Sequence, residues 1–140
     1  MSVFVLDTDR LSLYQHATRP VVCQRVQAHA ANELAITIIT VEEQLTGWYS
    51  LLRRAKKPAA QADAYRRLAH TVHSLSRLEI LLYTEDAIAR YNKLRTRKLN
   101  IGKMDLRIAA IVLEHAATLV TRNLRDFSRV RDLNLEDWSQ

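Results

Sequence analysis

The feature that most constrains the fold is an alternation of short, continuously apolar runs with longer stretches of helical periodicity. The apolar runs are rich in Val, Ile and Leu, which is typical of strands that are buried on both faces. Such an alternation predicts a parallel sheet with helices on both faces, an α/β fold. Strands are predicted at residues 3–6, 34–40, 78–83 and 117–121, with a last edge strand near 133–135. Helices are predicted at 8–15, 20–30, 40–57, 58–75, 85–98 and 102–116, with a helical turn at 124–128.

The chain is expected to form a single domain over residues 1–140, because 140 residues with 48% hydrophobic composition can bury a core of their own. Only two glycines and two prolines interrupt it, which favours long helices and short loops. No internal repeat or low-complexity linker divides the sequence.

Several features predict a cytoplasmic protein. No stretch approaches the ~20 apolar residues that span a bilayer, and no basic segment followed by an apolar run suggests a secretion signal. The single cysteine, Cys23, cannot form an internal disulfide, which fits a reducing compartment.

The net charge of +6 and the pI of about 9.8 favour anionic partners. Nucleic acid is the first of these to consider, because clustered Lys and Arg side chains bind phosphates without sequence specificity.

Acidic residues that are far apart in the sequence are predicted to meet at one edge of the sheet, because the carboxyl ends of parallel strands lie together. Asp7 follows the first strand, and Glu43 lies in the predicted first turn of the helix that leaves the second. Asp105 begins the helix that feeds the fourth strand, and Asn123 and Asp126 follow that strand.

Each acid also has an ordinary structural explanation. Thr40 and Glu43 have the spacing of a capping box, and Asp105 near a helix start is favoured by the helix dipole. Asp7 or Asp9 could cap a helix, and Asp126 could be a surface residue. Together, however, such carboxylates repel one another unless a cation lies among them. Mg²⁺ and Mn²⁺ prefer oxygen ligands of this kind.

An acidic metal site in a basic protein suits a metal-dependent nuclease. The basic side chains bind phosphates, and the metal ion activates water and stabilises charge on the phosphoryl oxygens. The same carboxylates could also serve a phosphatase or a DNA nuclease.

Four segments in order resemble the PIN-domain ribonucleases, specifically the VapC toxins of type II toxin–antitoxin systems. "VLDTDRL" resembles the opening LDTN signature, and "ITVEEQLTGW" is similar to the E-L-x-x-G segment. "IGKMDLRIAA" resembles the IG-x-x-D-x-x-IAA motif, and "LVTRNLRDFSRVRDLNLEDW" resembles the closing stretch. The sequence departs from the pattern at Asp9, where Asn is usual, and at Gln44, where Leu is common. It departs again at Asn123, where many PIN domains carry Asp.

The resemblance implies which residues form the site. Asp7 and Asp105 are implied as metal ligands, and the catalytic acids are these two with Glu43 and Asp126. Supporting roles fall to Thr8 and Asn123. The basic run before Asp105 suggests phosphate contacts at Arg97, Lys98 and Lys103.

The resemblance also implies a three-layer α/β/α fold with a mostly parallel sheet and endonucleolytic RNA cleavage that depends on Mg²⁺ or Mn²⁺. The expected partners are an RNA substrate, a second copy of the chain and a cognate antitoxin, whose C-terminal segment would cross the active-site groove. The alternative is a catalytically idle PIN-like domain that binds RNA or protein.

Overall fold

The computed structural model describes residues 3–7, 21, 24, 27–29 and 31–138. Asp7 is therefore described, whereas Thr8, Asp9 and Cys23 lie outside the described residues, as does the whole helix predicted at 8–15. Within the predicted helix 20–30, residues 21, 24 and 27 are helical.

The centre of the fold is a five-stranded sheet with the order β3-β2-β1-β4-β5, in which every neighbouring pair is parallel. The predicted parallel sheet is confirmed, including its last edge strand. Each strand is only three or four residues long. The strands are β1 (Phe4–Leu6), β2 (Leu34–Thr37), β3 (Glu79–Leu81), β4 (Thr118–Val120) and β5 (Asn134–Glu136).

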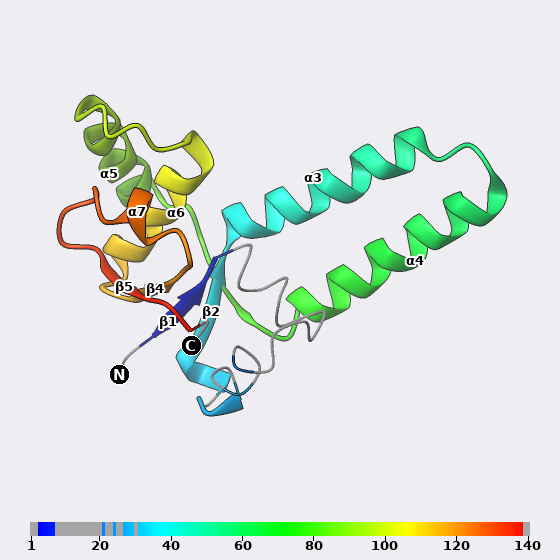
Figure 1. The fold of residues 1–140 in the computed structure, drawn as a ribbon, viewed down its shortest axis with the longest axis horizontal. Coiled ribbons are helices and arrows are strands. Elements are labelled where there is room, and N and C mark those ends of the chain that lie inside the picture. Colours follow the sequence, from blue (N-terminus) through cyan, green and yellow to red (C-terminus); the bar gives the residue numbers. More distant parts are fainter. Residues whose placement is uncertain (1–2, 8–20, 22–23, 25–26, 30, 139–140) are drawn as a thin grey trace.

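Helices cover both faces of the sheet, so the predicted three-layer α/β/α arrangement is confirmed (Figure 1). The helices α5, α6 and α7 gather on one side, whereas α3 and α4 form a long hairpin that extends away from the sheet. The bounds are η1 (Ala31–Glu33), α3 (Ile38–Arg54), α4 (Pro58–Leu75), α5 (Glu85–Thr96), α6 (Lys103–Glu114) and α7 (Leu124–Phe127).

Two hydrophobic clusters fill the space on either side of the sheet. Alternate strand residues point to opposite faces, so Val5 and Leu119 join the cluster beneath α5 and α6, which includes Ile111. Leu6 and Val120 join the other cluster, whose members include the fully buried Trp138. This packing fixes the ends of β1 and β4 beside each other.

The start of α3 differs from the prediction. Strand β2 ends at Thr37, not Thr40, because Thr37 has an extended backbone (φ −94°, ψ 158°) and its hydroxyl accepts a hydrogen bond from the Thr40 backbone N–H at 3.2 Å. Thr37 is thus the N-cap. The predicted Thr40–Glu43 capping box is wrong, and Glu43 lies in the second helical turn rather than the first.

Other helix starts agree with the prediction. Pro58 opens α4, where its missing N–H costs nothing. Thr84 caps α5 and accepts a hydrogen bond from the Ala87 backbone N–H at 3.2 Å. Within the described part of the chain, no helix is long and apolar enough to cross a membrane.

Candidate active site

Asp7 lies at the carboxyl end of β1, as predicted, with only 8% of its surface exposed. Its backbone N–H donates a hydrogen bond to the Val120 carbonyl at 3.2 Å, which extends the pairing of β1 with β4 by one residue. The carboxylate is therefore fixed at the edge of the sheet where two central strands end.

Glu43 and Asp105 reach the same edge on helices. Glu43 is half-buried on α3, which leaves β2, the neighbour of β1. Asp105 is half-buried in the first turn of α6, which leads into β4, the other neighbour of β1. The topology thus brings the elements that carry these three acids to one side of the sheet, and α3 contacts α6 directly.

The acids do not form a tight cluster in the described structure. Among residues 3–7, 21, 24, 27–29 and 31–138, no three Asp, Glu, His or Cys side chains are grouped so that they could hold a metal ion. Asp7, Glu43 and Asp105 each have a partner within the protein. Their oxygen donors have the chemistry that Mg²⁺ prefers.

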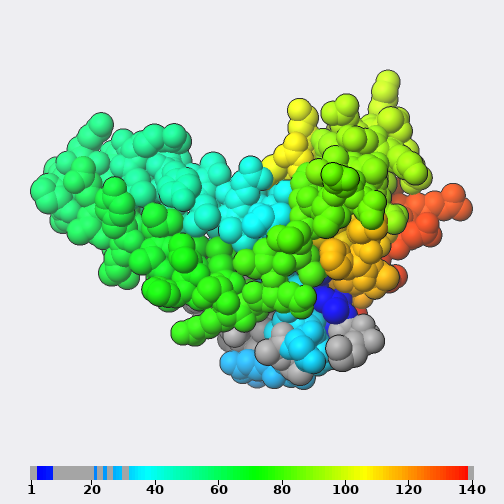
Figure 2. Space-filling model, turned by 180° about the vertical axis from the view of Figure 1, so that it is seen from behind, coloured from blue at the N-terminus to red at the C-terminus, as the bar shows by residue number. Residues whose placement is uncertain are grey.

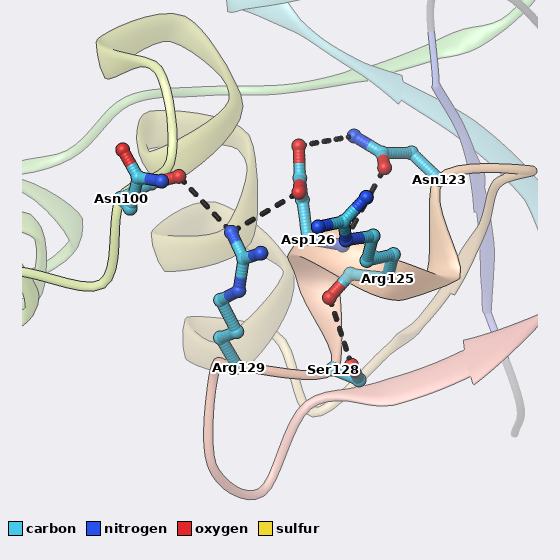
Figure 3. A network of polar contacts seen from close by, with 6 residues as sticks. All are labelled: Asn100, Asn123, Arg125, Asp126, Ser128 and Arg129. Carbon is cyan, nitrogen blue, oxygen red and sulfur yellow. Dashed lines mark hydrogen bonds and ion pairs between the residues drawn. The ribbon is translucent and has the colours of Figure 1, made fainter.

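The fourth acid, Asp126, belongs to a polar network around α7 (Figure 3). One carboxylate oxygen accepts a hydrogen bond from the Asn123 side-chain amide at 3.1 Å. The other oxygen pairs with the Arg129 guanidinium at 3.1 Å. Asn123 is also the N-cap of α7 and accepts from the Asp126 backbone N–H at 3.4 Å. Both oxygens of Asp126 are thus engaged within the protein.

Arg129 is the residue of this neighbourhood that the sequence did not single out. Its Nη1 also donates to the Asn100 carbonyl at 3.1 Å, so it joins α7 to the loop that precedes α6 (Figure 3). The available signal was the three-residue spacing between Asp126 and Arg129, which suits an ion pair across one helical turn.

The basic residues predicted to contact phosphates surround that loop. Arg97 ends α5, Lys98 follows with a positive φ of 51°, and Lys103 begins α6. All three are exposed. Arg90, from the same basic run, is instead paired with Glu114 of α6 at 2.9 Å. The part of the run nearest Asp105 is therefore exposed and has no ion pair to another described residue of the kind that Arg90 makes.

An aromatic and basic cluster anchors α6 behind Asp105. The Arg107 guanidinium lies 5.4 Å from the centre of the Tyr91 ring, within the range of a cation–π contact. Burial raises the pKa of Tyr83 above its ordinary value, and the nearby Arg107 opposes that shift. These contacts attach the first turns of α6 to α5 and to the segment after β3.

The sequence matches the family model described as "PIN domain" over residues 5–133. The chain belongs to the PIN-domain family. Its relatives include proteins named ribonuclease VapC, and its structural neighbours include VapBC complexes. A ribonuclease VapC2 of Rickettsia felis is 33% identical over 113 residues, covering 78% of this chain and 77% of the relative. A ribonuclease VapC1 of Haemophilus influenzae is 26% identical and covers 99% of both chains.

Solved VapBC structures share the fold of this PIN domain. A DNA-bound VapBC from Salmonella typhimurium superposes with a TM-score of 0.80 and 27% identity over 99% of both chains. VapBC2 from Rickettsia felis, bound to a DNA fragment from its promoter, gives a TM-score of 0.76 and 28% identity over 97% of this chain and 98% of that one.

Proposed function

We propose that this PIN-domain protein is a metal-dependent endoribonuclease that acts as the toxin of a toxin–antitoxin pair. The observation that carries the proposal is the buried Asp7 at the end of β1, flanked by the elements that bear Glu43 and Asp105. The names of its relatives, ribonuclease VapC2 and ribonuclease VapC1, support an RNA substrate.

In this proposal Asp7 and Asp105 bind Mg²⁺ or Mn²⁺, since Asp7 follows β1, Asp105 begins the helix that leads into the neighbouring strand β4, and both offer carboxylate oxygens. When bound, the ion lowers the pKa of a water molecule and stabilises negative charge on the phosphate. Glu43 accepts a proton from the attacking water as a general base. Asp126 follows β4 and is the fourth acid of the proposed site, and the Arg129 guanidinium partly neutralises its charge.

Supporting roles go to Thr8 and Asn123. Asn123 orients the Asp126 carboxylate through its side-chain amide, 3.1 Å from Oδ2. The exposed Arg97, Lys98 and Lys103 contact RNA phosphates beside the site.

The proposed partners are an antitoxin and a second copy of the chain. The VapBC neighbours support an antitoxin partner. We expect its C-terminal segment to cross the candidate active site, where the acids would accept an Arg side chain in place of the metal ion.

The deciding experiment is cleavage of a labelled RNA by purified protein in Mg²⁺ or Mn²⁺, compared with EDTA and with Asp7→Asn. Asp132→Asn is a matched control, because Asp132 is exposed and has a φ of 68°, which Asn tolerates well. Cleavage that is lost with EDTA and with Asp7→Asn, but kept by Asp132→Asn, is the expected result. Cleavage that survives both treatments would overturn the assignment of the site.

A second candidate function is an idle PIN-like domain that binds RNA or protein without turnover. It is favoured by the absence of a three-residue metal group among the described residues and by the pairing of Asp126 with Arg129. RNA binding that Asp7→Asn strengthens, with no cleavage by either protein, would establish this function instead.

A further inference from the structure

The charge of the α3–α4 hairpin is strongly polarised along its length. Residues 53–67, which form its distal half, contain six basic side chains and one acid, Asp63. The two acids of α3, Glu42 and Glu43, lie instead near the root, close to the sheet. The hairpin is an arm that reaches outward from the body of the protein (Figures 1 and 2). Its tip is therefore positive, and its root adjoins the candidate active site.

A groove of about 650 Å³ lies between the two helices of this arm. Glu43 and Trp48 of α3 line the groove from its root, and Arg54 lines it near the tip. The facing wall on α4 includes Arg66, Arg67 and His70.

A side-chain hydrogen bond joins the two helices that form the groove. The Trp48 indole N–H donates to the Thr71 hydroxyl at 2.7 Å, which fixes the antiparallel register of α3 and α4. From Glu43 to Arg54 the helix advances by about 16 Å at ~1.5 Å per residue. A stacked strand of a few nucleotides spans that distance, since its phosphates are ~3.4 Å apart along the axis.

The arginines of α4 are arranged around one carboxylate. Asp63 pairs with Arg66 at 2.6 Å and with Arg67 at 3.0 Å, and both arginines are exposed whereas Asp63 is half-buried. The hydrogen bond from Arg66 lowers the pKa of Asp63, with smaller contributions from Arg67. Asp63 itself does not line the groove. Its two ion pairs hold the Arg66 and Arg67 guanidinium groups at the groove wall. Each guanidinium keeps further N–H donors that can bind a phosphate.

We propose that this groove binds the phosphates of an RNA strand that runs from the candidate active site outward along the hairpin. The proposal rests on the proposed function for the position of the cleaved phosphate, but the groove's charge and geometry stand independently of it. Arg54, Arg66 and Arg67 bind the backbone at the distal end, and Glu43 marks the end where cleavage occurs. We favour an RNA strand over an acidic peptide, because the groove is lined at its root by Glu43 of the candidate active site and farther out by Arg54, Arg66 and Arg67.

The test measures binding of a fluorescent single-stranded RNA in EDTA, which prevents metal-dependent cleavage. The groove variant is Arg54→Ala with Arg66→Ala and Arg67→Ala. The control variant is Arg53→Ala with Lys56→Ala and Lys57→Ala, which removes the same charge from the same arm outside the groove lining. The groove variant is expected to bind RNA at least tenfold more weakly. The slope of log K against the logarithm of salt concentration should also become shallower by about 2, because three phosphate contacts are lost. The control is expected to weaken binding less than threefold.

A charge-reversal pair tests the groove without removing an arginine. A Cβ atom added at Gly47, in the groove wall, would meet no atom beyond its own helix backbone and chain neighbours within 4 Å, so the site can take a longer side chain. Gly47→Glu should weaken RNA binding and Gly47→Lys should strengthen it. Asp63→Asn should strengthen binding a few-fold, because it releases Arg66 and Arg67 to the phosphates.

The outcomes separate the groove from the catalytic proposal. Equal losses in the groove and control variants, or no loss in either, would overturn the groove. An acidic peptide that binds the groove without displacing RNA would also overturn it. If the groove variant loses RNA binding but the wild-type protein never cleaves RNA, the groove proposal is supported and the proposed nuclease activity is contradicted.

Discussion

Arg129 and Asp126 form an ion pair with 3.1 Å between Nη1 and Oδ1, and the same nitrogen donates to the Asn100 carbonyl at 3.1 Å. One guanidinium thus joins the segment after β4 to the loop before α6, which carries Asp105. Asn100 has a positive φ of 59°, so this loop adopts a tight conformation that a fixed contact helps to maintain. In the proposed enzyme, Arg129 is therefore a positioning residue, because it holds the loop that leads to Asp105 through the Asn100 carbonyl.

Arg129→Ala is expected to lower the free energy of unfolding by about 1–2 kcal/mol, since it removes a charge-assisted hydrogen bond and a partly buried ion pair. RNA cleavage should fall as well, because the loop before Asp105 loses its anchor. Urea denaturation and cleavage assays measure the two effects. Arg131→Ala, at an exposed position nearby, is the control and should change neither.

Asp126→Asn is expected to reduce cleavage less than Asp7→Asn does. Arg129 already offsets the negative charge of Asp126, whereas Asp7 is buried at the centre of the sheet edge. The turnover rates of the two variants, measured on one RNA at saturating Mn²⁺, test this order. A larger loss in Asp126→Asn would make Asp126 a primary catalytic acid.

The sequence predicted the sheet well because its strands are short, buried and unlike the helices in composition. It failed at the junction of β2 and α3, where "ITIIT" reads as continuous strand. Thr37 and Thr40 are both suitable N-cap residues. Thr37 takes the role because the pairing of β2 with β3 ends there, at the pair formed by Thr37 and Leu81. That limit is a tertiary contact, which local propensity does not contain.

The elements that carry the acids could be placed from topology alone, but the hydrogen-bond partners of the acids could not. The contact between Arg129 and Asn100 joins residues 29 positions apart and involves a backbone carbonyl. No residue pattern encodes such a contact. The groove between α3 and α4 was similarly hidden, because Arg53 and Arg54 are adjacent in the sequence, yet only Arg54 lines the groove.

Thr37→Ala is expected to destabilise the protein by about 1–2 kcal/mol, because it removes the buried N-cap of α3. Thr37→Ser keeps the hydroxyl and should recover most of that loss. Thr46→Ala, at an exposed position on the same helix, is the control. Denaturant midpoints measure all three, and equal midpoints for the Ala and Ser variants would contradict the capping role.

Arg107→Leu is expected to raise the pKa of Tyr83 further. Burial already raises that pKa, and Arg107 partly offsets the effect by favouring the phenolate. Because the Tyr83 pKa is raised in the folded state, Tyr83 contributes its full stabilisation at pH values below the pKa of an unfolded tyrosine. That stabilisation is lost as the pH rises through the pKa of Tyr83 in the folded protein. Tyrosinate absorbance during alkaline titration, with Tyr83→Phe to assign the signal, measures the shift. A lower Tyr83 pKa in Arg107→Leu would contradict it.

Removal of divalent metal should lower the thermal stability of the wild-type protein and leave Asp7→Asn unaffected. A ligand that binds only the folded state stabilises it by about 2.7 kcal/mol at a concentration of 100 times Kd. For a chain of this size that corresponds to a rise in Tm of roughly 8 °C. The measurement is the Tm in Mn²⁺ and in EDTA for wild type, Asp7→Asn, Asp105→Asn and Asp132→Asn. Wild type and Asp132→Asn should show the rise, and the two site variants should lose it. An equal rise in all four proteins would place the metal elsewhere, because Asp7 and Asp105 would then contribute nothing to its binding.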